Sequence, residues 1–149
     1  MAVLDISAAA LARAKARLGP LQHVVRWIEA DVTGDWESPP VDIWHDRAAF
    51  HFLTEAEDRA RYVARLRQTL RPGGSLIAAT FALDGPPRCS GLPVIGYSAA
   101  TLGAQIGPEF VLMETVDAIH RTPRGVPQPF CHSRFVRRLD VASPARHGR

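Results

Sequence analysis

The stretch Leu70–Leu92, which reads LRPGGSLIAATFALDGPPRCSGL, decides the fold that this sequence predicts. Pro72 cannot continue a helix and Gly73-Gly74 can adopt positive φ, so a helix is expected to end here in a sharp turn. Ser75–Ala82 is then almost wholly apolar, a pattern typical of a parallel strand that helices cover on both faces. Because ligands bind beyond the carboxyl ends of such strands, Ala82–Leu92 is expected to lie near a site.

The composition is that of one globular domain. The chain has 149 residues, of which 46% are hydrophobic and 22% are charged, and its formal net charge is +3. No apolar run approaches the ~20 residues of a membrane-spanning helix, and the N-terminus does not resemble a signal peptide. Cys89 and Cys131 do not form a disulfide framework, which favours a reducing, cytoplasmic location.

Strand-like and helix-like segments alternate along the chain, and this alternation predicts an α/β fold with a parallel sheet. A capping box is expected at Thr54-Glu55-Ala56-Glu57, and Ser7 and Ser98 are expected to cap the other two helices, which end at Gly19-Pro20 and Gly107-Pro108. Strands are expected at 3–6, 24–31, 41–46, 75–82, 110–116 and 130–136, with a loop at 33–40 and a hairpin connection at 122–129.

A parallel sheet that ends in an antiparallel edge hairpin resembles the Rossmann-like fold of class I S-adenosylmethionine-dependent methyltransferases. The resemblance covers residues 1–138, and residues 139–149 are expected to form a basic, poorly ordered tail. The family's first strand and its glycine-rich turn, an acid followed by Gly-x-Gly-x-Gly, have no counterpart here, so the fold is expected to be N-terminally truncated. The strands that flank the first strand in the family must then pair directly or leave open edges.

The resemblance implies S-adenosylmethionine (SAM) as cofactor. Asp5, at the end of the expected first strand, would accept hydrogen bonds from both ribose hydroxyls, and Ile6 would pack on the adenine. Asp31 would accept from the adenine amino group, while the backbone N–H of Val32 would donate to a ring nitrogen. The alternatives are that Asp5 is a helix-entry acid and that Asp31 is a solvated loop acid.

The segment Trp44–Phe52 follows the strand that ends beside the sulfonium in this family. His45, Asp46 and His51 are therefore candidate catalytic groups that could accept a proton from a nucleophile, and Asp46 is also a candidate cofactor ligand. A metal site is not expected, because His45 and His51 lie six residues apart on different helix faces with no third ligand nearby.

Arg47 and the loop residues Arg88, Cys89 and Ser90 are candidate substrate-binding groups. A hydrolase that pairs Cys89 with His120 or His132 is an alternative. It is disfavoured because the chain has no nucleophile elbow and no oxyanion loop, and a buried, inert thiol is the simpler alternative.

We therefore expect a SAM-dependent methyltransferase that acts on a small-molecule or protein acceptor. One alternative is a non-catalytic remnant that binds a partner through an unpaired sheet edge. Another is a nicotinamide-dependent oxidoreductase, but Tyr62 and Tyr97 are not followed by lysine in a Tyr-x-x-x-Lys motif. Nucleic acid is not an expected partner, since no aromatic residues are interleaved with the C-terminal arginines. A membrane is not an expected partner either, since no apolar run is long enough to span one. The sequence does not indicate an oligomeric state.

Overall fold

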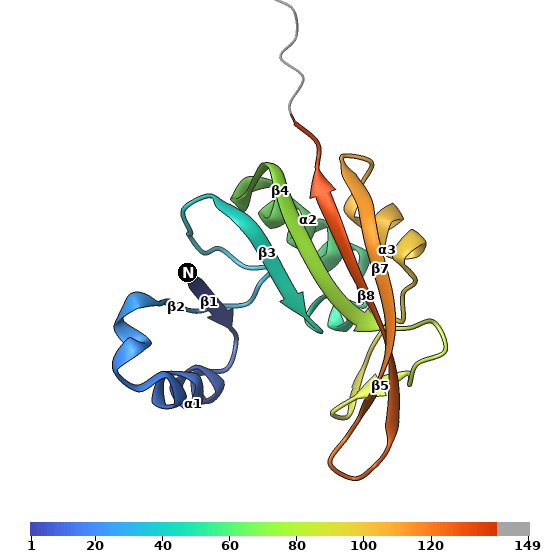
Figure 1. The fold of residues 1–149 in the computed structure, drawn as a ribbon, viewed down its shortest axis with the longest axis horizontal. Coiled ribbons are helices and arrows are strands. Elements are labelled where there is room, and N and C mark those ends of the chain that lie inside the picture. Colours follow the sequence, from blue (N-terminus) through green and yellow to red (C-terminus); the bar gives the residue numbers. More distant parts are fainter. Residues whose placement is uncertain (140–149) are drawn as a thin grey trace, which may run out of the picture.

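The computed structural model describes residues 1–139, so most of the expected tail at 139–149 lies outside the described residues (Figure 1). Apart from the two short strands β5 and β6, the strands and helices follow the predicted order. The elements are β1 (Ala2–Asp5), α1 (Ala8–Leu18), η1 (Gly19–Val24), β2 (Arg26–Glu29), β3 (Val41–Arg47), η2 (Phe50–Phe52), α2 (Ala56–Thr69), β4 (Leu70–Phe81), β5 (Arg88–Cys89), β6 (Leu92–Pro93), α3 (Ala99–Ile106), β7 (Phe110–Arg121) and β8 (Pro127–Arg137). No helix within residues 1–139 is long and apolar enough to cross a membrane.

The strands form a four-stranded sheet in the order β3-β4-β8-β7 and a separate parallel pair, β1-β2. β3 and β4 pair in parallel, with Ile43 opposite Ser75 and Arg47 opposite Ala79. β8 is antiparallel to both of its neighbours. The fold is therefore the expected Rossmann-like α/β arrangement, with one difference. The reversed strand β8 lies inside the sheet, and the edge strand is β7, which runs in the same direction as β4.

The break between β1 and β3 is the main departure from a continuous sheet. The sequence left two outcomes open for these strands, direct pairing or open edges. Within residues 1–139, β1 pairs only with β2 and β3 pairs only with β4. The arrowheads of β1 and β3 point the same way in Figure 1. The structure therefore shows two parallel strands whose facing edges are both open.

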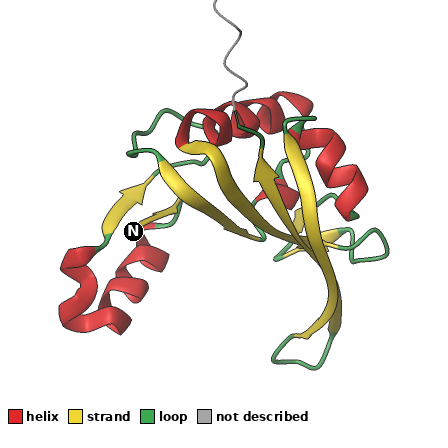
Figure 2. Cartoon of the chain, turned by 45° about the horizontal axis from the view of Figure 1, so that its top comes forward, coloured by secondary structure: helices red, strands yellow, loops and turns green. Residues whose placement is uncertain are grey.

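One face of the four-stranded sheet carries the hydrophobic core. α2 and α3 both lie on this face (Figure 2), where Leu66 and Leu102 pack against Leu76 and Phe135. The expectation that helices cover β4 on both faces is wrong for the residues that the structure describes. The apolar composition of β4 has another cause. On the second face Phe81 is buried beneath the aromatic rings of His51 and Phe130 rather than beneath a helix.

The Pro72-Gly73-Gly74 segment does not form the expected turn between a helix and a strand. α2 ends at Thr69, and β4 begins directly at Leu70, so the three residues lie inside the strand. Gly73 has φ of 81°, and a Cβ atom on Gly74 would lie 2.8 Å from the Leu70 side chain. The glycines therefore permit an irregularity within β4, at which the register against β3 shifts. They do not reverse the direction of the chain.

Two of the three predicted helix caps are confirmed. The Ser7 hydroxyl accepts a hydrogen bond from Ala10 N–H, and Ser98 forms a reciprocal capping box with Thr101. The predicted capping box at Thr54 is wrong: Glu55 is the N-cap of α2 and makes no side-chain cap bond. Thr54 lies one residue too early, because its N–H is bonded to the Phe52 carbonyl at the end of η2.

The C-terminal hairpin is longer than predicted, since β7 and β8 remain paired from Phe110–Arg137 to Arg121–Pro127. The loop expected to carry Arg88, Cys89 and Ser90 forms a small hairpin of its own. Ser90 and Gly91, both with positive φ, turn β5 into β6. Alternation could not reveal this hairpin because each of its strands has only two residues.

Candidate active site

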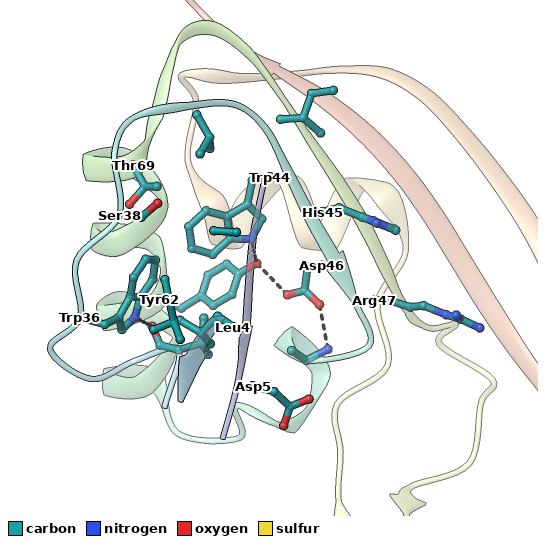
Figure 3. Close-up of a pocket in the computed structure, with 16 residues that line it drawn as sticks. Leu4, Asp5, Trp36, Ser38, Trp44, His45, Asp46, Arg47, Tyr62 and Thr69 are labelled. Atoms are coloured by element: carbon teal, nitrogen blue, oxygen red, sulfur yellow. Dashed lines mark hydrogen bonds between the residues drawn. The ribbon is translucent and has the colours of Figure 1, made fainter. Parts of the chain in front are cut away.

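A cavity of about 380 Å³ lies between β1 and β3 and reaches the carboxyl ends of both strands (Figure 3). This is the edge of a parallel sheet at which ligands are expected. Most of its wall is apolar or aromatic, and its charged groups come from the two strand ends. The lining residues are Ala2, Leu4, Asp5, Ile28, Val32, Trp36, Ser38, Val41, Ile43, Trp44, His45, Asp46, Arg47, Ala49, Tyr62 and Thr69.

Asp5 ends β1 and contributes a carboxylate to the cavity. Its Oδ1 accepts a 2.7 Å hydrogen bond from Ser7 N–H, the residue that caps α1. Its Oδ2 accepts no hydrogen bond from the residues that the structure describes. Asp5 is therefore held at the entry to α1, as an ordinary helix-entry acid would be, and it keeps one oxygen for a ligand. Ile6, the next residue, is 71% exposed and does not line the cavity.

The loop after β2 closes a second wall. The Asp31 carboxylate accepts hydrogen bonds from the N–H and the hydroxyl of Thr33, both at 2.8 Å, and is exposed beside the cavity rather than within it. Val32 does line the cavity, and its carbonyl accepts a 3.1 Å bond from the Trp36 indole. Arg65 of α2 donates to the Gly34 carbonyl and so fixes this loop against the helix.

A buried hydrogen-bond network forms the floor of the cavity. The Tyr62 hydroxyl of α2 donates to Asp46 Oδ2 at 2.7 Å and accepts from the Trp44 indole at 2.9 Å. Asp46 also accepts from the backbone N–H groups of Ala49 and Phe50, at 2.7 and 3.1 Å. Burial of Asp46 raises the pKa of its carboxyl above the usual value, although these hydrogen bonds act to lower it. The two oxygens thus hold three donors and fix the turn after β3.

That turn depends on a strained residue. Ala48 has φ of 65°, a conformation that alanine seldom adopts. Its N–H donates to the Ala79 carbonyl at 2.9 Å. The Asp46 carboxylate accepts hydrogen bonds from the N–H groups of the next two residues, Ala49 and Phe50. His45 and Arg47, next to Asp46 on β3, extend to the side away from Tyr62 in Figure 3. The structure therefore gathers Asp5, His45, Asp46 and Arg47 around one cavity.

His51 is not among the residues that line this cavity. Its side chain has no exposed surface, and its Nδ1 accepts a 3.1 Å hydrogen bond from Phe81 N–H. The ring lies 4.6 Å from the rings of both Phe52 and Phe81. Burial lowers the pKa of His51 to about 4, so the imidazole is neutral at physiological pH. The hydrogen bond from Phe81 to His51 therefore joins η2 to the end of β4.

The candidate substrate residues in the small hairpin also lie apart from the cavity. Arg88 turns back on its own hairpin and donates to the Gly91 carbonyl. Cys89 is half-buried, whereas Cys131 is buried with its sulfur beside the hydroxyl of Ser133. Neither thiol has a histidine as a hydrogen-bond partner within residues 1–139. That part of the chain also contains no group of three or more potential metal ligands.

Sequence reasoning missed two aromatic residues of the site, Trp36 and Tyr62. Trp36 lies within the polar loop predicted at 33–40, which gave no packing signal, yet its ring lies 5.8 Å from that of Trp44. Tyr62 stands next to Val63 on the buried side of α2, and this position could have identified it as an inward residue. Trp44 and Asp46 share one face of β3 by strand alternation, which was also readable from the sequence.

Comparison with known proteins identifies the family of the chain. A family model described as "Methyltransferase domain" matches residues 1–78, just over half of the chain. The thiopurine S-methyltransferase of Vibrio atlanticus (strain LGP32) is 44% identical over 63 residues, which cover 37% of this chain and 29% of that protein. The corresponding protein of Vibrio parahaemolyticus is 43% identical over 63 residues, with the same coverage. The chain thus spans less than a third of the length of these relatives.

Solved structures share the fold at low sequence identity. The N-methyltransferase NodS from Bradyrhizobium japonicum WM9 matches with a TM-score of 0.70 and 15% identity, over 92% of this chain and 72% of that one. A SAM-dependent methyltransferase from Methanosarcina mazei matches with a TM-score of 0.73 and 13% identity, over 93% and 82%. These structures share the fold of this chain, and the family model matches more than half of it. The chain therefore belongs to the methyltransferase domain family.

Proposed function

We propose that this chain binds SAM in the cavity between β1 and β3 and takes part in transfer of its methyl group to a nucleophilic acceptor. One observation carries the proposal: a single cavity at the carboxyl ends of parallel strands brings Asp5, Val32 and Asp46 together. The family match supports it, as does the likeness to NodS solved with S-adenosylhomocysteine (SAH), with a TM-score of 0.69.

The residues present fit the nucleoside half of the cofactor. The Oδ2 atom of Asp5 can accept hydrogen bonds from ribose hydroxyls, because only Oδ1 is engaged by Ser7. The apolar wall of Leu4, Ile28 and Val32 offers a surface for a purine ring. In this proposal Ile6 and Asp31 contribute from the rim, with Asp31 already shaped by its bonds to Thr33.

The residues at the end of β3 would position the acceptor and accept its proton. When bound, SAM supplies a methyl group activated by the sulfonium charge, so positioning and exclusion of water are the protein's main contributions. We assign proton acceptance from the nucleophile to His45, which borders the cavity. Asp46 is assigned a positioning role, because both of its oxygens already hold donors. Arg47 would orient the acceptor.

The names of the relatives indicate a class of acceptor. The Vibrio relatives are named thiopurine S-methyltransferases, so a small aromatic thiol is the first acceptor to test on this chain. A protein side chain is the second. The hairpin that carries Arg88, Cys89 and Ser90 lies outside the cavity lining and would contact an acceptor only at its far end.

Isothermal titration of the chain with SAM and, separately, with SAH tests the proposal. We expect saturable binding of both molecules with dissociation constants in the micromolar range, and at least a tenfold loss of affinity for the Asp5→Ala variant. Circular dichroism on the same samples shows that the protein is folded. A folded chain that binds neither molecule at millimolar concentration would overturn the proposal.

A further inference from the structure

β7 is the edge strand of the four-stranded sheet, and nearly all of it is exposed. Eleven of its twelve residues are exposed, including Val116 at 53% and Ile119 at 67%. Within residues 1–139, β7 pairs only with β8. The hairpin of β7 and β8 also continues past Phe81, the last residue of β4, so the outer part of this edge projects from the rest of the sheet (Figure 1). An exposed, partly apolar edge of this kind can pair with another strand.

The hydrogen bonds of the hairpin determine which main-chain groups of β7 point outward. Thr122 N–H donates to the Val126 carbonyl at 3.0 Å, so these two residues form a hydrogen-bonded pair. Such pairs alternate along antiparallel strands, and the odd-numbered residues of 117–121 therefore direct their N–H and C=O groups away from β8. Pro129 of β8 lies opposite Ile119 and agrees with this assignment, because proline has no N–H to donate across the pair.

The features that commonly keep a sheet edge unpaired are missing from residues 115–121. Prolines, lysines and β-bulges protect such edges. This stretch contains neither proline nor lysine, and the irregularity of β7 lies before it, between Leu112 and Glu114. The outward edge is therefore regular over residues 115–121.

Residues 117–121, which read DAIHR, are complementary to a second copy of themselves. When two identical strands pair antiparallel about a two-fold axis, one residue faces its own copy and the residues on either side pair crosswise. With Ile119 on the axis, each Asp117 lies opposite Arg121 of the other copy. With Asp117 or Arg121 on the axis, two like charges would face each other, which is unfavourable. No other centre in β7 places an acid of the strand directly opposite its arginine.

The side chains that would meet also share one face of the sheet. Asp117 and Ile119 both line a cavity of about 770 Å³ between the hairpin and the start of α3. Arg121 lies on the same face by strand alternation. Pairing therefore brings the two Ile119 side chains together and places an Asp117–Arg121 ion pair on each side of them.

We propose that two copies of this chain associate along the outward edge of β7, with residues 117–121 antiparallel and Ile119 on the two-fold axis. The main chains exchange hydrogen bonds at Ile119 and between Asp117 and Arg121, and the two sheets become one. An interface this small is typical of a reversible complex. The inference does not rest on methyl transfer, and its test contains no cofactor.

Sedimentation velocity over a range of protein concentrations measures the association. We expect a reversible monomer–dimer equilibrium for the wild type. Asp117→Arg and Arg121→Asp each place like charges opposite one another, so each variant alone should dimerise at least about tenfold more weakly. An equal mixture of the two variants should dimerise like the wild type, because every crosswise pair then joins opposite charges. Arg13→Asp, the same charge change at an exposed position of α1, is the control and should not alter the equilibrium.

Amide hydrogen exchange locates the contact. Dimer formation should slow exchange at the amides of Asp117, Ile119 and Arg121, and should leave Leu4 and His45, at the open edges of β1 and β3, unchanged. Protection of β1 or β3 in place of β7 would show that the copies are joined elsewhere and would overturn the proposal.

Three further outcomes would also overturn it. One is a wild-type chain that stays monomeric at every soluble concentration. Another is a dimer of undiminished affinity in both single variants. The third is a mixture of the two variants that fails to associate although circular dichroism shows that both are folded. If either variant is unfolded, Ile119→Lys replaces it, because it puts two like charges on the axis and should also weaken the dimer.

Discussion

The Tyr62 hydroxyl donates a 2.7 Å hydrogen bond to Asp46 and so joins the middle of α2 to the end of β3. Burial raises the pKa of Tyr62 well above 10, so the hydroxyl remains a donor throughout the physiological range. The same carboxylate holds the turn that contains the strained Ala48. One buried bond therefore links the packing of a helix to the shape of the candidate site.

Loss of this bond should destabilise the protein. We expect Tyr62→Phe to lower the free energy of unfolding by about 1.5–3 kcal/mol, the range for a hydrogen bond to a charged group. The matched control is Tyr97→Phe, because Tyr97 is also a buried residue, 4% exposed, and its hydroxyl makes no hydrogen bond within residues 1–139. That variant should lose less than about 0.5 kcal/mol. Urea denaturation measures both, and equal losses would contradict the role of the Asp46 bond.

His51 should make stability depend on pH. Its pKa is lowered to about 4 in the folded chain from 6.5, so the unfolded chain binds the extra proton between these values. Stability is then fully present above pH 6.5 and is lost as the pH falls toward 4, by about 3 kcal/mol at most. The raised pKa of Asp46 has the opposite effect on stability. Above pH 3.8 the folded chain binds more protons at this carboxyl than the unfolded chain does, so its contribution increases stability as the pH falls.

The His51→Gln variant separates the two effects. Glutamine can still accept the Phe81 N–H bond but does not titrate, so the loss of stability between pH 6.5 and 4 should be smaller than in the wild type. Chemical denaturation at several pH values gives the comparison. Identical pH dependence in both proteins would show that His51 is not the responsible group.

The observed helix caps predict unequal effects of two similar substitutions. Ser98→Ala removes a hydroxyl that accepts from Thr101 N–H and should cost about 1 kcal/mol of stability. Thr54→Ala removes a hydroxyl without a cap bond and should cost less than about 0.5 kcal/mol. Thermal and urea unfolding can rank them. A larger loss for Thr54→Ala would restore the capping box that the sequence suggested for α2.

Asp5 should contribute to cofactor affinity if SAM binds as proposed. We expect Asp5→Ala to weaken SAH binding by about 1.5–3 kcal/mol, the value of a charge-assisted hydrogen bond. Asp117→Ala is the control, because Asp117 is an exposed acid on β7 away from this cavity. Calorimetric titration of the two variants gives the difference. Unchanged affinity for Asp5→Ala would exclude the ribose contact.

Local signals predicted much of the fold because they depend on few neighbours. The caps at Ser7 and Ser98 and the C-terminal hairpin follow from hydrogen-bonding chemistry and side-chain periodicity. The Pro-Gly-Gly segment was predicted wrongly, because a turn and an irregular strand require the same positive φ. Only the contact of Gly74 with Leu70 and β3 distinguishes them.

Less of the candidate site than of the fold could be predicted from the sequence, because the site depends on contacts between distant residues. Asp5 and Asp46 could be selected because each stands at the end of a strand. The hydrogen bond from Tyr62 could not be predicted, because it joins residues 16 positions apart through the packing of α2 on β3. His51 resembled a catalytic group in sequence, and only the rings of Phe52 and Phe81 around it reveal its burial.

The separation of the two sheets divides the site between two units of unequal stability. Among the described residues, the unit of β1, α1 and β2 contributes only Leu11 and Val25 to the buried apolar side chains, and all the others lie at or beyond Phe50. Segments with so little buried surface open by local unfolding below the global free energy. Asp5 thus stands on the weaker unit and Asp46 on the stronger, and any ligand that contacts both gives the two a common unfolding transition.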